Sequence, residues 1–191
     1  MTTITPALNL THLFTSLPQK QWTLLRVLKS ANPHDINGNL HGTASFTPLD
    51  TTTAQPQSPP QRQLLYTETG TLPAHIGHNL QWKKSYIWRL STPSTSTVKD
   101  DLSVWFVKVG DEKDDEYVSA PVPPAAGGET VVVTARGNHL CINDMYRTAY
   151  AFRVLKGDGI GEVVSWASRH VVKGPKKDQD IVNYYTLRDA V

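Results

Sequence analysis

Residues that can transfer protons alternate with aromatic residues along several short segments of this sequence. On a β-strand, side chains two residues apart point to the same side, so Tyr66 and Glu68 share one face, and Ser168 and His170 share another. His139 occupies a similar position in its own segment. A carboxylate and a histidine in one partly dry pocket can act as general acid and base. The pattern therefore raises cofactor-independent isomerisation, cyclisation or dehydration of a bound hydrophobic molecule as one candidate chemistry.

The aromatic members of these faces have the character of a ligand cavity, whereas an ordinary core face holds mainly aliphatic residues. Flat apolar walls suit a planar or polycyclic ligand. A half-exposed sheet surface that carries one acid is the alternative interpretation. The candidate catalytic residues are Glu68, His139, Tyr150 and His170. The candidate substrate-binding residues are Tyr66, Tyr86, Trp88, Arg89, Phe152, Trp166 and Ser168.

Glu68 is the central residue of this hypothesis. A buried carboxylate without a partner is costly, so we expect a partner for it inside the protein. His139, His170 or a tyrosine hydroxyl are the candidates. We therefore expect the side chains of Glu68 and His139 to point into one shared interior.

The sequence lacks the motifs of several enzyme classes. It has no Gly-x-Ser-x-Gly, no P-loop and no Gly-x-Gly-x-x-Gly that opens a helix, and no cofactor is expected. Seven histidines are present without a His-x-His or His-Glu-x-x-His pattern, so no metal site is predicted. A zinc site from distant histidines, or a haem barrel, is a third and lesser alternative. The single cysteine, Cys141, excludes an internal disulfide.

Composition points to one all-β domain. The chain has 191 residues, of which 39% are hydrophobic and 19% are charged, with 13 Pro and 12 Gly. This blend suits many short strands joined by irregular loops. A net charge of +2 and an acidic run near residue 114 do not favour nucleic acid as a partner. No apolar run is long enough for a membrane span, and the first residues do not resemble a signal peptide, so a cytoplasmic location is expected. The sequence does not predict the oligomeric state.

The elements that must position these residues follow from periodicity. Leu10, Leu13, Phe14 and Leu17 share one helical face, which predicts a short helix over residues 10–17 that ends at Pro18. Period-two alternation predicts strands from residue 22 and over 40–47, 63–72, 82–90, 101–109, 129–135, 138–143, 145–156, 162–173 and 180–188. No helical segment separates them, so an antiparallel sheet is expected. About ten strands in one domain require two packed sheets or a closed barrel.

Three segments have little to bury: 48–62, 91–100 and 111–128. We expect mobile loops near these positions. The segment 174–178 is a tight turn with two lysines, Lys176 and Lys177. A solvated hairpin is the favoured interpretation of this turn, and attraction of an anionic ligand at a barrel mouth is the other.

Longer motifs add a resemblance. Leu65-Tyr66-x-Glu68-x-Gly70, Tyr86-x-Trp88-Arg89, a His139 to Phe152 pattern and Gly174-Pro175-Lys176-Lys177-Asp178 resemble a family of small lipocalin-like proteins of unknown function, over nearly the whole chain. The resemblance implies a single antiparallel lipocalin-like (calycin) β-barrel of about 8–10 strands with a short N-terminal helix. It implies no activity. The leading expectation for function is therefore binding of a hydrophobic, aromatic or polycyclic small molecule in the barrel, with the cyclase or isomerase as the alternative.

Lipocalin-like barrels also tend to pack an arginine near the end of the last strand against a tryptophan at the start of the first. Trp22 is in place, and Arg188 is the expected partner through a cation–π contact. Lys20 stands where such barrels carry glycine, which is a departure from that pattern.

Overall fold

A computed structural model describes residues 10–18, 20–49, 61–77, 79–91, 101–105, 118–141, 143–156, 162–175 and 177–188. In these residues the chain forms one antiparallel sheet of nine strands, preceded by a short helix. The elements are α1 (Leu10–Ser16), β1 (Gln21–Ser30), β2 (Gly38–Leu49), β3 (Gln61–Thr71), β4 (Gln81–Ser91), β5 (Asp101–Trp105), β6 (Thr130–Cys141), β7 (Asp144–Leu155), β8 (Val163–Lys173) and β9 (Asp178–Leu187). The order across the sheet is β5-β4-β3-β2-β1-β9-β8-β7-β6. The expectation of an all-β antiparallel fold of eight to ten strands with an N-terminal helix is confirmed.

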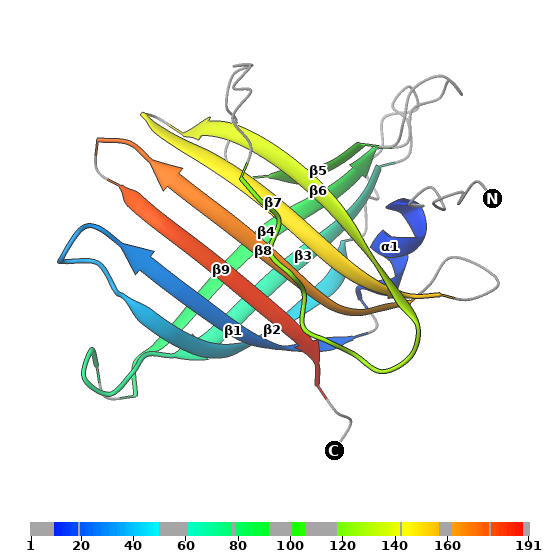
Figure 1. Ribbon diagram of the computed structural model, residues 1–191, viewed down its shortest axis with the longest axis horizontal. Helices are drawn as coiled ribbons and strands as arrows, with labels where there is room; N and C mark the ends of the chain where they lie inside the picture. The colour runs from blue at the N-terminus through cyan, green and yellow to red at the C-terminus, as the bar shows by residue number, and fades with distance from the viewer. Residues whose placement is uncertain are drawn as a thin grey trace.

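The sheet curls strongly, so that one of its faces encloses an interior (Figure 1). Rings from β3 and β4 meet rings from the other half of the sheet: the ring centroids of Tyr66 and Tyr185 lie 6.4 Å apart, and those of Trp88 and Tyr150 lie 5.5 Å apart. In the part of the chain that the structure describes, the ladder of paired strands ends at β5 on one side and at β6 on the other. The architecture is therefore a curled half-barrel.

Strand β1 illustrates why these segments form this sheet. Its alternate residues Trp22, Leu24 and Arg26 are buried, whereas Gln21 and Thr23 are exposed. Alternation with period two places one set of side chains on the interior face and leaves the other set in solvent. Two of the interior positions hold ordinary core residues, and the third holds an arginine.

The helix α1 closes one end of the interior. Leu13, Phe14 and Leu17 are at most 2% exposed and pack into the same core as Leu90 and Val163. In Figure 1 the helix (blue) lies at the end of the strands opposite to the turn between β8 and β9. Its apolar spacing predicted this burial, and the predicted bounds differ from the observed ones by a single residue at the C-terminal end.

Two details of the sequence interpretation are wrong. The segments 129–135 and 138–143 were expected to be separate strands, but they form one strand, β6, in which Gly137 pairs with Thr148 of β7. The expected cation over Trp22 was Arg188, but the cation there is Lys20, whose Nζ lies 6.0 Å from the ring centroid. Arg188 is exposed, and its backbone N–H donates to the carbonyl of Gln21.

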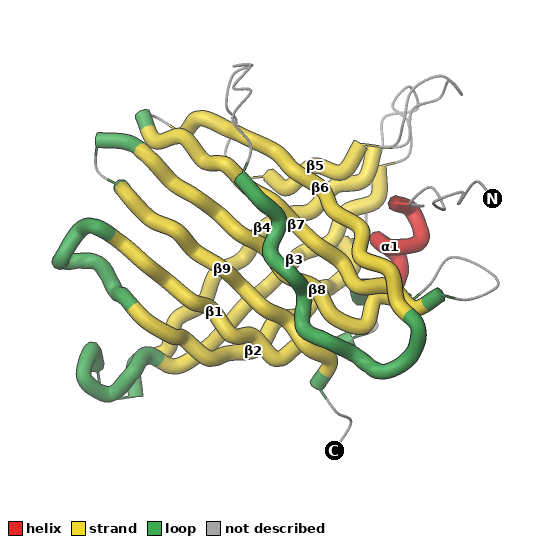
Figure 2. The backbone as a smooth tube through the Cα atoms, in the orientation of Figure 1, coloured by secondary structure: helices red, strands yellow, loops and turns green. Residues whose placement is uncertain are grey.

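Residues 118–128 cross the outer face of the sheet over β7 and β8 (green in Figure 2). Arg153 donates from Nε to the Pro124 carbonyl (2.9 Å) and from Nη2 to the Pro123 carbonyl (3.1 Å), and Ser165 donates to the Pro124 carbonyl (2.5 Å). Pro123 is buried. The outward alanines of these strands are fully covered: Ala149, Ala151 and Ala167.

The expectation that residues 111–128 contact little is therefore wrong for 118–128. Residues 48, 49, 61 and 62, which were assigned to a loop, belong to β2 and β3. Ser91, also assigned to a loop, belongs to β4. The other parts of the three expected loops, 50–60, 92–100 and 111–117, lie outside the described residues, and their mobility stays a prediction. No helix in the described ranges is long and apolar enough to cross a membrane.

Arg153→Ala tests the attachment of the 118–128 segment. The substitution leaves two backbone carbonyls without their guanidinium donor, and lost hydrogen bonds of this kind cost about 1–3 kcal/mol. We expect a lower free energy of unfolding in urea and faster proteolysis within 118–128. Lys156→Gln, which removes an exposed ion pair with Glu129, is the control and should stay close to wild type. Unchanged proteolysis of Arg153→Ala would contradict this account of the segment.

Candidate ligand cavity

The interior face encloses a cavity of about 330 Å³. Its wall is built from β1, β3, β4, β7, β8, β9 and the turn between β8 and β9. Cavities of this size hold small molecules in other proteins, at the lower end of the usual range. The curl of the sheet thus forms a chamber that one compact ligand can fill.

Aromatic rings form the deep part of the wall. Tyr66, Trp88, Trp166 and Tyr185 all line the cavity and are at most 3% exposed. The rings of Trp166 and Tyr185 stack face to face, with centroids 3.5 Å apart and an interplanar angle of 1°. Trp88 meets Trp166 edge-on at 5.9 Å. Each ring is fixed by its neighbours, so the wall is preformed.

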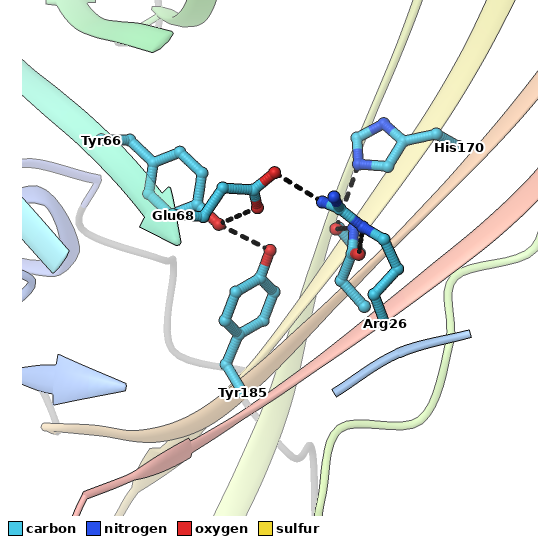
Figure 3. Close-up of polar contacts among 7 residues, drawn as sticks. Arg26, Tyr66, Glu68, His170 and Tyr185 are labelled. Carbon is cyan, nitrogen blue, oxygen red and sulfur yellow. Dashed lines mark hydrogen bonds and ion pairs between the residues drawn. The ribbon is translucent and has the colours of Figure 1, made fainter. Parts of the chain in front are cut away.

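A buried ion pair crosses this wall. Nη2 of Arg26 donates to Oε1 of Glu68 at 2.7 Å, and the side chains are 7% and 1% exposed (Figure 3). The guanidinium also lies over the ring of Trp82, 5.1 Å from its centroid. The pKa of Arg26 is raised: burial alone lowers it, but the Glu68 charge and the nearby tyrosines more than offset this. The guanidinium is therefore held in its charged form.

Gly70 explains part of the Tyr-x-Glu-x-Gly motif. A Cβ atom at Gly70 would lie 2.6 Å from the Trp82 ring, and one at its cross-strand partner Gly42 would lie 3.1 Å from the same ring. The two glycines thus leave the space in which Trp82 lies against the sheet and under Arg26. A side chain at Gly70 would displace the ring that covers the buried cation.

Tyrosine hydroxyls extend the network on one side of the ion pair. Tyr66 donates to Oε2 of Glu68 at 2.8 Å, and its oxygen lies 2.8 Å from the hydroxyl of Tyr185 (Figure 3). A phenol has one proton, and an ionised carboxylate can only accept. Since the one hydroxyl hydrogen of Tyr66 points to Glu68, the hydroxyl of Tyr185 donates to that of Tyr66. The direction of this part of the network is therefore fixed.

The amide of Asn183, two hydroxyls and the imidazole of His170 extend the network on the Arg26 side of the ion pair. Nε of Arg26 donates to Oδ1 of Asn183 (2.8 Å), and Nδ2 of Asn183 donates to Oγ of Ser168 (2.9 Å). Ser168 Oγ lies 3.1 Å from Nε2 of His170, whose Nδ1 lies 3.0 Å from Oγ1 of Thr148. The network thus runs without interruption from Tyr185 to Thr148.

Burial raises the pKa of the tyrosines in the wall. It raises the pKa of Tyr86 to about 12, and it moves the pKa of Tyr66, Tyr150 and Tyr185 further above the ordinary value. The negative charge of Glu68 acts in the same direction on all four. These hydroxyls are therefore neutral donors and acceptors at neutral pH.

Most of the predicted site residues come together in this cavity. Lining it are Tyr66, Glu68, Tyr86, Trp88, Tyr150, Trp166, Ser168 and His170. Two predicted residues do not line it. Phe152 lies behind the wall and stacks on Trp166 at 5.9 Å, and Arg89 alternates with Trp88 and falls on the opposite face of β4. The catalytic and binding roles of the lining residues remain predictions.

The expected partners of Glu68 need two corrections. A tyrosine hydroxyl is confirmed as one partner, but the other is Arg26, which the sequence interpretation did not consider. Among the described residues, a path of hydrogen bonds links His170 to Glu68 through Ser168, Asn183 and Arg26. The backbone of His139 pairs with Tyr146, but its side chain lies outside the description, so a shared interior with Glu68 stays a prediction.

Several residues of the site were missed, among them Arg26, Asn183 and Tyr185 of the buried network. The sequence signal that could have revealed them is their position in the two-residue repeat of buried side chains. Arg26 follows Trp22 and Leu24 at period two, and Asn183 and Tyr185 are two apart on the last strand. A charged residue in phase with buried apolar ones indicates a buried polar position.

The described residues contain no group of three or more His, Cys, Asp or Glu placed to hold a metal ion. Both ring nitrogens of His170 lie within hydrogen-bonding distance of hydroxyl groups. Ligation of zinc or haem iron by His170 would break one of these contacts. The geometry at this residue thus favours hydrogen bonding over metal ligation.

The fold and the cavity define a class of protein: a curled antiparallel β-sheet that encloses an aromatic chamber crossed by a buried ion pair. Comparison with known families gives a match over residues 19–187 to a family of unknown function, DUF6314, and the chain belongs to this family. Searches of curated proteins and of solved structures return no match. The expectation of a family of unknown function is confirmed, and its function has to be inferred from the cavity itself.

A double-mutant cycle tests the ion pair. Glu68→Gln leaves the Arg26 charge buried without compensation, and Arg26→Met does the same to Glu68, so each should cost about 3–5 kcal/mol. The double variant should cost less than the sum of the two, because no lone charge remains. The measurement is urea denaturation at pH 7. Lys173→Gln, at an exposed ion pair, is the control, with a change of about 1 kcal/mol or less. Strictly additive costs would show that the two groups do not interact.

Alkaline pH tests the buried tyrosines. Their native pKa values are raised, so above pH 10 the unfolded chain releases protons that the native protein keeps. Their contribution to stability is complete below pH 10 and is lost as pH rises towards 12 and beyond. Each tyrosine should lower the free energy of unfolding by up to about 1.4 kcal/mol per pH unit in this window. Denaturation at pH 9 to 11 measures the slope. Tyr86→Phe should lower the slope of the free energy of unfolding against pH by the contribution of one proton. An unchanged slope would contradict the burial of Tyr86.

Proposed function

We propose that this protein binds a hydrophobic small molecule with a flat aromatic or polycyclic body in the cavity. The observation that carries the proposal is the combination of a preformed 330 Å³ chamber with a wall of fixed aromatic rings. Rigid rings lose little conformational entropy when a ligand stacks against them, and they offer a large apolar area. Van der Waals contact and apolar burial are therefore the main source of affinity.

The geometry supports binding more than catalysis by Glu68. Its two carboxylate oxygens already accept hydrogen bonds from Arg26 and Tyr66 at 2.7 and 2.8 Å. A general base needs an oxygen within reach of the substrate's proton, whereas both oxygens of this carboxylate are engaged by protein donors. Glu68 is therefore a positioning residue in this proposal, which holds Arg26 and Tyr66 in place.

Acid–base catalysis is the second candidate, with His170 as its central residue. His170 and Ser168 both line the cavity and are 3.1 Å apart, so a proton can pass between them and a bound molecule. The test uses the molecule that co-purifies with the protein. If the protein is an isomerase or cyclase, wild type should convert this molecule. His170→Gln should still bind it, but the rate of conversion should fall by roughly a hundredfold or more.

A lipocalin-like (calycin) relationship is the architectural part of the proposal. Supporting it are the antiparallel order of nine strands, the curl that encloses an aromatic interior and the helix that closes one end. Trp22 on the first strand, with a cation over its ring, also fits that class, although the cation is Lys20. Barrels of this kind have room for one small ligand.

A cavity-filling variant tests the binding function. Ile181 lines the cavity, and its neighbour Val182 points to the other side of β9. Ile181→Trp should fill part of the chamber and weaken binding of 2-naphthylmethanol by about tenfold or more, since overlap with the ligand removes its contacts. Val182→Trp adds the same side chain outside the cavity and should bind as wild type does. Ligand fluorescence measures the binding, and thermal denaturation verifies that both variants fold.

Native mass spectrometry of the protein purified from its source cells supplies the independent test. An aromatic molecule retained by wild type and absent from Ile181→Trp would support the proposal. Equal binding of 2-naphthylmethanol by both tryptophan variants, or none by wild type, would overturn it.

A further inference from the structure

The cavity changes character between its deep end and its mouth. The deep wall consists of buried rings, including Trp88 and Trp166. The mouth is formed by Lys84 on β4, Tyr146 on β7, Lys177 in the turn between β8 and β9, and Gln179 at the start of β9. An elongated ligand would therefore meet apolar groups at one end and cationic groups at the other.

The charges of the wall do not balance. The lining residues include three cations, Arg26, Lys84 and Lys177, and one carboxylate, Glu68. Arg26 and Glu68 neutralise each other at 2.7 Å, so the excess positive charge belongs to the two lysines at the mouth. Unbalanced charge beside a low-dielectric wall attracts an ion of opposite sign.

The two lysines differ in how far their charge is compensated. Lys177 donates to the Tyr146 hydroxyl at 2.6 Å and lies 3.6 Å from a carboxylate oxygen of Asp144. For Lys84, the described part of the chain provides no carboxylate within ion-pair distance. Its pKa is lowered by partial burial and by the charges of Arg26 and Lys177, against the attraction of Glu68. An anion at the mouth would relieve this repulsion.

The turn that carries Lys177 is held in place. A Cβ atom at Gly174 would lie 2.1 Å from Oδ1 of Asp144, so glycine permits the turn to pack against the start of β7. Asp144 in turn lies beside Lys177. The Gly-Pro-Lys-Lys-Asp motif thus places one lysine at the cavity mouth, opposite Lys84 on β4.

From this arrangement we propose that the ligand is an aromatic acid, whose ring system lies among the buried rings and whose anionic group lies at the mouth between Lys84 and Lys177. The inference rests on the proposed binding function and specifies the ligand class. The anionic group is a carboxylate or a phosphate, since both offer oxygen acceptors to two ammonium groups. The apolar body supplies most of the affinity, and the acid sets the orientation.

A series of naphthalene probes that differ only in charge tests this inference. The probes are 2-naphthoate, 2-naphthyl phosphate, neutral 2-naphthylmethanol and cationic 2-naphthylmethylamine, with binding measured by fluorescence titration at pH 7. We expect at least one anion to bind about fivefold or more tightly than the neutral probe, the cation to bind most weakly, and the anionic preference to shrink as salt increases. Comparison of the two anions distinguishes a carboxylate from a phosphate.

Adjacent lysines provide a matched pair of variants. Lys84→Gln should remove most of the preference for the anion and leave the affinity for 2-naphthylmethanol within about twofold. Lys83→Gln has the same change in net charge, but its side chain lies on the other face of β4 and should change neither affinity. Both side chains reach solvent, and Lys84 is buried only in part, so neither variant should fail to fold.

The outcomes separate the two levels of the proposal. If 2-naphthylmethanol binds but no anion binds more tightly, or if Lys83→Gln and Lys84→Gln behave alike, the aromatic-acid inference is wrong and the binding function stands. If no probe of the series binds, the binding function itself is overturned.

Discussion

The ion pair between Arg26 and Glu68 is the constraint on which the rest of the interior depends. Two charges that are 7% and 1% exposed can remain there only if each finds a partner of opposite charge and hydrogen bonds for its remaining polar atoms. Glu68 satisfies this through Arg26 and Tyr66, and Arg26 through Glu68, Asn183 and the face of Trp82. Removal of any of these groups leaves a neighbour with an unsatisfied charge or dipole.

The strand register makes this network possible. Arg26 pairs directly with Asn183, Asn183 with Ser168, and Thr148 with His170, so each of these contacts joins cross-strand neighbours on one face. The contact from Arg26 to Glu68 spans one intervening strand, β2, whose residue opposite Glu68 is the small Ala44. The same curvature brings the Tyr66 hydroxyl to that of Tyr185. The network therefore depends on both the register and the curl of the sheet.

Alternation in the sequence was enough to predict which residues share a face, and most of the cavity wall follows from it. Contacts between strands did not follow. Arg26 and Glu68 are 42 residues apart, and Tyr66 and Tyr185 are 119 apart, so no local pattern reveals that they meet. Arginine is rarely buried, so a residue of this type in phase with Trp22 and Leu24 was not considered as part of the interior. Residues 136 and 137 were left out of the expected strands, but pairing with β7 overrides the low strand propensity of Gly137. The proline-rich 118–128 segment was misjudged because its backbone carbonyls, rather than its side chains, make the contacts with Arg153 and Ser165.

Because the charges of the inner network are already paired, two other kinds of group recognise the ligand. The carboxylate of Glu68 and the guanidinium of Arg26 already have their partners, so a ligand gains little by displacing them. A ligand can make apolar contacts with the rings of the deep wall, where the indole N–H of Trp166, one of the lining residues, has no acceptor within the described residues. At the mouth, an anionic ligand can form ion pairs with the lysines. Affinity for the body of a ligand and selectivity for its polar end therefore arise at different depths of one cavity, and the ion pair between them keeps the wall in a fixed shape.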